Sequence, residues 1–133
     1  MSFLTKCGLS PKGLAERYLY SPDMAFRYAF ARWWGPPDLN STDVWVLLNA
    51  ATGDTEGRAR PTLARCAARS RADGRSGLLI LNLFAWRHAD PKLLKTAPEP
   101  VGRANDEVLQ SLTRIAARTI VAWGAGGRLN GRS

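Results

Sequence analysis

The sequence predicts an α/β domain, with a short and mainly parallel sheet between two layers of helices. Three short apolar runs bounded by turn residues, at 43–49, 77–82 and 119–124, have the pattern of strands that are buried on both faces. Segments with helical periodicity separate these runs. Because parallel strands are joined by crossover helices, this alternation predicts a right-handed three-layer α/β/α arrangement.

A β-hairpin is predicted before the first of these runs. In residues 17–34, aromatic and polar residues alternate around a Ser-Pro-Asp turn signal at 21–23. We therefore expect three parts along the chain: an N-terminal extension (1–16), a single α/β domain (17–124) and a flexible tail rich in glycine and arginine (125–133).

Two segments have the periodicity and end signals of helices. Residues 61–74 begin with proline and end with glycine, and Arg65 and Arg69 lie together on the face opposite the apolar stripe. The second segment, NDEVLQSLTRIAART, has Asn105 or Asp106 as its expected N-cap. Its apolar stripe comprises Val108, Leu109, Leu112, Ile115 and Ala116.

Composition favours a folded protein with an anionic partner. An apolar fraction of 45% argues against disorder, and a net charge of +8 favours polyanions such as nucleic acid. Of the 19 basic residues, 15 are arginine, a bias that a GC-rich genome also produces without selection for binding. Cys7 and Cys66 form no metal-binding motif, so neither a metal nor a cofactor is expected.

The sequence also predicts a cytoplasmic location without membrane association. No apolar run approaches the roughly 20 residues that cross a bilayer. The first residues lack the apolar region of a signal peptide.

Two asparagines mark the expected ligand site. Asn49 ends the first apolar run and Asn82 ends the second, and ligands of parallel sheets bind beyond the carboxyl ends of the strands. An amide offers both donors and an acceptor, so this pair could read the edge of a nucleobase. The alternative is that each asparagine caps the following loop through local backbone bonds. For Asn82, the apolar residues Leu83 and Phe84 that follow favour the binding role.

Four basic residues are candidate phosphate ligands: Arg87, His88, Arg65 and Arg69. The alternative is that Arg87 pairs with Asp90, that His88 is an ordinary surface residue, and that the two helical arginines form a solvated face.

The loop after the first run carries the acids nearest to the expected site, Asp54 and Glu56. Either could activate a water molecule, with Asp54 our first choice. Acids in surface loops are also common for solubility alone.

The strings LLNAATGD, LNLFAWRHADPKLL, EPVGRANDEVL and IVAWGAGG resemble the family called domain of unknown function 1643, over residues from about Arg17 to Gly127. That family brings no established activity. GLLILN and IVAWG also resemble, more distantly, strands of the uracil-DNA glycosylase superfamily. This resemblance implies a glycosylase-like fold in which Asn82 reads the edge of a flipped base and Asn49 positions the water for N-glycosidic hydrolysis.

The chain departs from these families at three places. Ala50 and Ala51 stand where the uncharacterised family has Pro-Ser, and the first loop has no aromatic residue to stack on a base, a role left to Phe84 or Trp86. A final strand with a His-Pro motif has no counterpart before Ser133. Lacking that strand, the edge of the 119–124 strand is expected to be exposed and to favour self-association.

Three functions follow from these observations. The first is a nucleobase- or nucleic-acid-binding protein with weak or no catalysis. The second is an active N-glycosidic hydrolase of a modified base or nucleotide, which would use Asn49 together with Asp54 or Glu56 as catalytic residues. The third is a phage or bacterial protein-interaction module that keeps the fold without the pocket.

Overall fold

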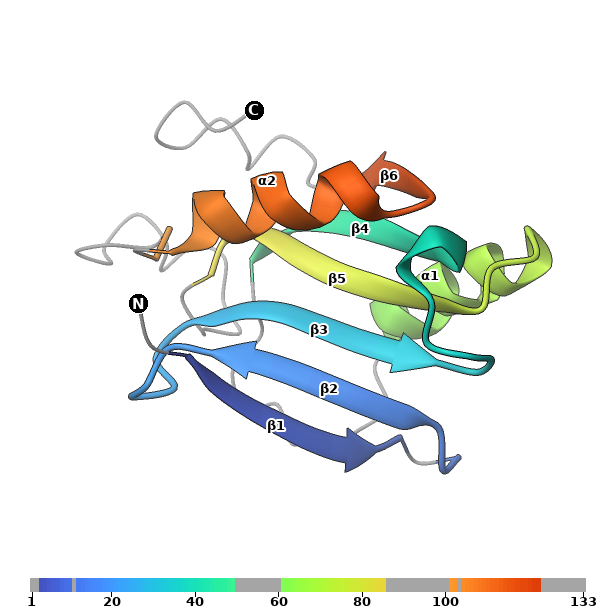
Figure 1. The fold of residues 1–133 in the computed structure, drawn as a ribbon, viewed down its shortest axis with the longest axis horizontal. Helices are drawn as coiled ribbons and strands as arrows, with labels where there is room; N and C mark the ends of the chain where they lie inside the picture. The colour runs from blue at the N-terminus through green and yellow to red at the C-terminus, as the bar shows by residue number, and fades with distance from the viewer. Residues whose placement is uncertain (1–2, 11, 50–60, 86–100, 103, 123–133) are drawn as a thin grey trace.

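The computed structural model describes residues 3–10, 12–49, 61–85, 101–102 and 104–122, which form one six-stranded sheet with two helices (Figure 1). The strand order across the sheet is β1-β2-β3-β5-β4-β6. The strands are β1 (Leu4–Leu9), β2 (Ala15–Tyr20), β3 (Arg27–Trp33), β4 (Thr42–Asn49), β5 (Gly77–Phe84) and β6 (Arg118–Val121). The helices are α1 (Pro61–Ala72), α2 (Asn105–Ile115) and a short 3-10 turn at Leu39–Ser41.

The N-terminal half of the sheet is antiparallel. β2 and β3 form the hairpin that alternation predicted. Residues 4–9, which the sequence assigned to an N-terminal extension, form β1 and pair with β2. β3 then pairs with β5, also in the antiparallel direction.

The C-terminal half is parallel, with β4 between β5 and β6. The prediction of a mainly parallel sheet is therefore wrong, because three of the five neighbouring strand pairs are antiparallel and two are parallel. The physical reason is that the unit of β1, β2 and β3 adds to the free edge of β5. Short turns between consecutive strands enforce antiparallel pairing within such a unit.

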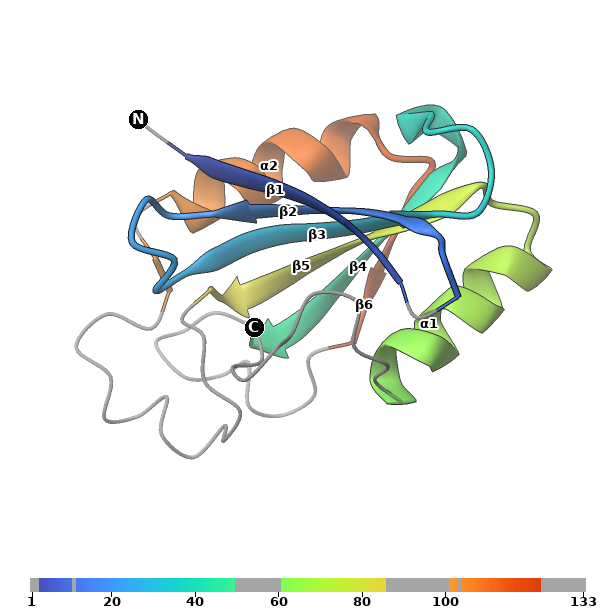
Figure 2. The same ribbon diagram turned by 90° about the horizontal axis from the view of Figure 1, so that it is seen from below.

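The two helices cover opposite faces of the sheet, which confirms the α/β class and the three layers (Figure 2). We call the two buried clusters the α1-side core, which includes Leu63, Cys66, Leu78 and Ile80, and the α2-side core, which includes Leu79, Leu81, Leu83 and Val108. Residues of β5 thus alternate between the two cores, as a strand buried on both faces requires.

Both helices begin close to the predicted residues, with two differences in α2. Its N-cap is Ala104, which makes no side-chain capping bond, so the prediction that Asn105 or Asp106 caps the helix is wrong. The Asn105 side chain is directed into the protein instead, where it bonds the backbone of β5. Ile115, predicted to lie on the apolar stripe, is 46% exposed because α2 ends there.

β5 is longer than the apolar run that predicted it. The strand continues through Leu83 to Phe84, so the prediction that Asn82 ends it is wrong. Pairing with β4 extends to the Phe84 position and keeps the strand regular past the amide. Asn82 therefore lies inside the strand, where its side chain is buried rather than at a solvated strand end.

β6 is the outermost strand at its side of the described sheet, and Val121 on it is 57% exposed. In the part of the chain that the structure describes, no helix has the length and apolarity to span a bilayer.

Gly77 begins β5 directly opposite Trp33 of β3, and we expect Gly77→Ala to destabilise the fold. A methyl group at this position would overlap the Trp33 ring and lie 2.7 Å from the carbonyl oxygen of Arg32. Overpacking of this kind costs about 1–3 kcal/mol, which urea unfolding would measure. An unchanged unfolding midpoint would contradict this account of the β3–β5 contact.

Candidate functional site

The parallel strands have the order β5-β4-β6, which is the second-first-third order of a doubly wound sheet, so the topological switch point lies at β4, on the side of β6. The chain leaving β4 continues into α1 on one face, whereas the chain leaving β5 continues into α2 on the other face. In α/β sheets, ligands bind in a crevice beyond the carboxyl ends of the strands next to such a point. The antiparallel half of the sheet lies on the side of β5 away from β4 (Figures 1 and 2).

Asn82 lies on β5, the neighbour of β4, on the α1 face of the sheet. It shares the face of Leu78 and Ile80, and its Cα partner on β4 is Leu47, which packs against the α1-side core. The side chain is 1% exposed, yet neither Nδ2 nor Oδ1 has a hydrogen-bond partner in the described part of the protein. A buried amide without partners costs about 1–3 kcal/mol, so this arrangement needs an explanation.

Asn49 on β4 and Phe84 on β5 lie two residues beyond Leu47 and Asn82, toward the carboxyl ends of the strands. They are Cα partners, so Asn49 is two residues beyond the partner of Asn82, on the order of 8 Å away between Cα atoms. The two asparagines thus belong to neighbouring strands, but not to directly opposed positions. For Asn49 the structure describes the backbone and not the side chain. Phe84 is fully buried and packs within the α2-side core.

Asn105 brings a second buried amide to β5. Its Nδ2 donates to the carbonyl oxygens of Asn82 at 2.7 Å and Leu83 at 3.1 Å. The residue is 0% exposed, and its Oδ1 accepts no hydrogen bond from the described residues. In the described part of the chain, the buried amide atoms without a partner therefore belong to Asn82 and to Asn105, which bonds the same stretch of β5.

Arg27 adds a buried positive charge at the same end of β5. It is 2% exposed, and its backbone N–H donates to the carbonyl oxygen of Ala85 at 2.9 Å. The flanking rings of Phe26 and Tyr28 stack on each other and pack on the α2-side core, while the β2 partner of Arg27, Tyr20, belongs to the α1-side core. Alternation along β3 therefore directs the guanidinium toward the face that carries Asn82.

The two helical arginines are both exposed, but they differ in their surroundings. Arg69 forms an ion pair with Asp73 at 3.1 Å and is thereby tied to the amino-terminal end of the parallel strands. Arg65, one turn earlier, lies toward the start of α1, the end nearer to the carboxyl ends of the strands. The remaining predicted site residues, Asp54, Arg87 and His88, lie outside the described residues and stay predictions.

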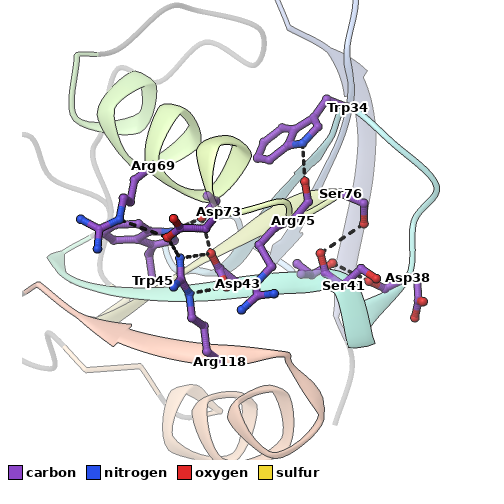
Figure 3. A network of polar contacts seen from close by, with 12 residues as sticks. Trp34, Asp38, Ser41, Asp43, Trp45, Arg69, Asp73, Arg75, Ser76 and Arg118 are labelled. Carbon is purple, nitrogen blue, oxygen red and sulfur yellow. Dashed lines mark hydrogen bonds and ion pairs between the residues drawn. The ribbon is translucent and has the colours of Figure 1, made fainter.

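A second polar cluster surrounds Asp43 at the opposite end of β4 (Figure 3). The buried carboxylate accepts hydrogen bonds from the Ser70 hydroxyl at 2.5 Å, from Arg75 Nε at 2.9 Å and from Arg118 Nε at 2.8 Å. Arg118 also bonds Asp73. The cluster therefore joins β4, α1, β6 and the segment just before β5 at one point.

This cluster is a structural element rather than a ligand site, because both carboxylate oxygens of Asp43 are already bonded. Burial alone would raise the pKa of Asp43, but the hydrogen bonds from Arg118, Ser70 and Arg75 outweigh burial and lower the pKa below its ordinary value. Asp43 is thus ionised in the folded protein at neutral pH. Asp43 has hydrogen bonds to both of its oxygens, whereas the Asn82 amide has none to the described residues. We therefore place the candidate site at the carboxyl ends of β4 and β5.

Sequence reasoning did not identify Arg27 or the inward orientation of Asn105. Arg27 lies between two aromatic residues of the predicted hairpin, and its position in that alternation is a signal that could have indicated a buried charge. Asn105 stands at a helix start, where a cap is the usual expectation. No local signal distinguishes a cap from a side chain that bonds a distant strand.

Comparison with known proteins gives one match. A family model described as "Protein of unknown function (DUF1643)" matches residues 27–133, which include every described element from β3 onward. No curated protein and no solved structure matches the chain, so the likeness to the uracil-DNA glycosylase superfamily stays a prediction from sequence. The family match covers most of the chain and agrees with the sequence resemblance: the protein belongs to the DUF1643 family of proteins of unknown function.

Proposed function

We propose that this protein binds a nucleobase, as part of a nucleotide or of single-stranded nucleic acid, at the carboxyl ends of β4 and β5. The observation that carries this proposal is the buried Asn82 amide, which has no partner in the described residues and lies on β5, next to the strand at the switch point. Buried polar atoms in native proteins are almost always bonded, so an unsatisfied buried amide needs an explanation, and a bound ligand supplies one. Its donor and acceptor complement the adjacent donor and acceptor of a base edge.

The charge distribution supports a ligand that carries phosphate. The buried guanidinium of Arg27 lies at the same end of β5, and Arg65 lies toward the near end of α1. The net charge of +8 raises the local concentration of any polyanion and speeds its association. We therefore test an arrangement in which Asn82 binds the base of a nucleotide and the phosphate of that nucleotide lies toward Arg65.

The test compares binding of short fluorescent single-stranded oligonucleotides, each of one base, by the wild-type protein and by Asn82→Leu. Loss of the amide leaves the base edge unpaired, so the affinity should fall roughly 10- to 100-fold for the preferred base. Ile80→Val is the matched control, because Ile80 lies two residues earlier on the same face and is also buried. Equal affinities of Asn82→Leu and the wild type would refute the proposal.

Arg65→Ala is expected to weaken binding to all oligonucleotides to a similar degree, because a phosphate contact carries no base identity. Removing one such contact should lower the slope of log affinity against log salt by roughly 0.7 for a single strand. The control is Arg114→Ala, an exposed arginine on α2, which covers the other face of the sheet. If both variants have the same salt slope as the wild type, Arg65 makes no phosphate contact.

A further inference from the structure

Asn105 connects the start of α2 to the one stretch of β5 that carries Asn82. Its Nδ2 donates two hydrogen bonds, to the Asn82 and Leu83 carbonyl oxygens, from a position with no solvent exposure. Neither bond belongs to the helix or to the sheet ladder. The bonds therefore connect α2 with β5 specifically, and the two asparagines are 23 positions apart in the sequence.

The Asn105 hydrogen bonds lie where the regular pairing between β3 and β5 is interrupted. Regular pairing between β3 and β5 ends at Phe30 and Ile80, and the next backbone bond between these segments joins Arg27 to Ala85. Between these two points β5 has four residues, 81–84, whereas β3 has only two, 28 and 29, so the extra residues on β5 interrupt the regular ladder there. The Asn105 amide donates to two carbonyl groups within this interrupted stretch of β5.

We propose that Asn105 is a positioning residue, which holds the backbone of Asn82 so that its amide faces the ligand. The proposal rests on the function proposed above. A purely structural bond would be expected to satisfy both ends of the Asn105 amide. Instead, Oδ1 is left buried without a described partner, an arrangement that lowers stability. Unsatisfied atoms retained at two contacting residues indicate selection for geometry at this place rather than for stability.

The first test observes Asn82 directly, in the protein without ligand. In Asn105→Ala, the side-chain NH2 signals of Asn82 in a ¹H–¹⁵N NMR spectrum should shift and broaden, because the strand backbone loses its donor. Val108→Ala is the matched control, since Val108 is buried on the same helix and packs in the α2-side core without bonding β5. Equal changes of the Asn82 signals in both variants would show a general structural effect and overturn the proposal.

The second test is a double-mutant cycle with the single-stranded oligonucleotide that the wild type binds most tightly. Asn105→Ala should lower this affinity roughly tenfold in the wild-type background, within the range for residues that share one network. In the Asn82→Leu background, the same change should have no further effect. A similar loss in both backgrounds would contradict action through Asn82.

The two tests separate failure of this proposal from failure of the proposed function. If the wild type binds none of the oligonucleotides, the nucleobase function fails, while the NMR comparison still decides whether Asn105 orients Asn82. If Asn105→Ala does not fold, Asn105→Ser replaces it in both tests, because the serine hydroxyl keeps one of the two donors. Asn105→Ser should then give smaller changes of the same kind, and wild-type signals with wild-type affinity would overturn the proposal.

Discussion

Asn82→Leu is expected to stabilise the protein in the absence of ligand by about 1–3 kcal/mol. The wild-type amide is 1% exposed, and the described residues provide no partner for either of its polar atoms. An apolar side chain that also branches at Cγ removes this desolvation penalty and packs on the face that carries Leu47 and Ile80. The measurement is the free energy of unfolding in urea, obtained for both proteins under the same conditions.

Higher stability together with lost binding would identify Asn82 as a residue kept for function, since stabilising changes at binding sites commonly lower activity. Asn82→Ala serves as the control for side-chain volume, because it removes the amide and leaves a cavity. It should therefore be less stable than Asn82→Leu. If Asn82→Leu instead unfolds at lower urea than the wild type, the amide has a structural partner and the main observation behind the proposed function fails.

Asp43→Asn is expected to destabilise the fold by about 3–5 kcal/mol, the largest loss among the changes considered. The variant removes a buried charge and leaves Arg75 and Arg118 without their shared carboxylate. Ser70 also loses a charged acceptor, which weakens the contact between α1 and β4. Urea unfolding gives the difference, and Asp73→Asn provides the control because Asp73 is a partly exposed carboxylate of the same cluster. The control should lose much less stability than Asp43→Asn.

The same pair of proteins has a pH signature with a defined sign. The folded-state pKa of Asp43 lies below its unfolded value, so its contribution to stability is complete above the unfolded pKa. That contribution is lost as the pH falls below about 4 and passes through the folded pKa. The stabilities of the wild type and Asp43→Asn should therefore converge in acid. A difference that stays constant from neutral pH to pH 2 would show that Asp43 acts through packing and not through charge.

Local patterns were sufficient to locate most of the elements. The run at 43–49 became β4, the helical segment at 61–74 became α1, and the alternation at 17–34 became the β2–β3 hairpin. These predictions succeeded because strand and helix periodicity and turn residues act over a few neighbouring positions. The register of the hairpin against β5 was beyond such patterns, because it depends on contacts such as Trp33 against Gly77 across more than 40 residues.

The site shows the same division. Asn82 was a candidate from its place after an apolar run, and the structure puts it inside β5 with its amide buried. No local sequence pattern predicted the hydrogen bond from Asn105 to this strand, because an asparagine at a helix start usually bonds its own helix. The interruption of the β3–β5 ladder at this place is likewise a property of strand pairing.

By itself, the sequence determined the α/β class, the positions of the main strands and helices, the positive charge and the family to which the chain belongs. Each of these follows from composition or from short-range periodicity. Only the tertiary structure decided that the sheet is mixed, that Asp43 is fully bonded and that the Asn82 amide is buried without a described partner. The physical reason is that burial and hydrogen-bond satisfaction depend on which distant segments meet, and chain packing alone sets those contacts.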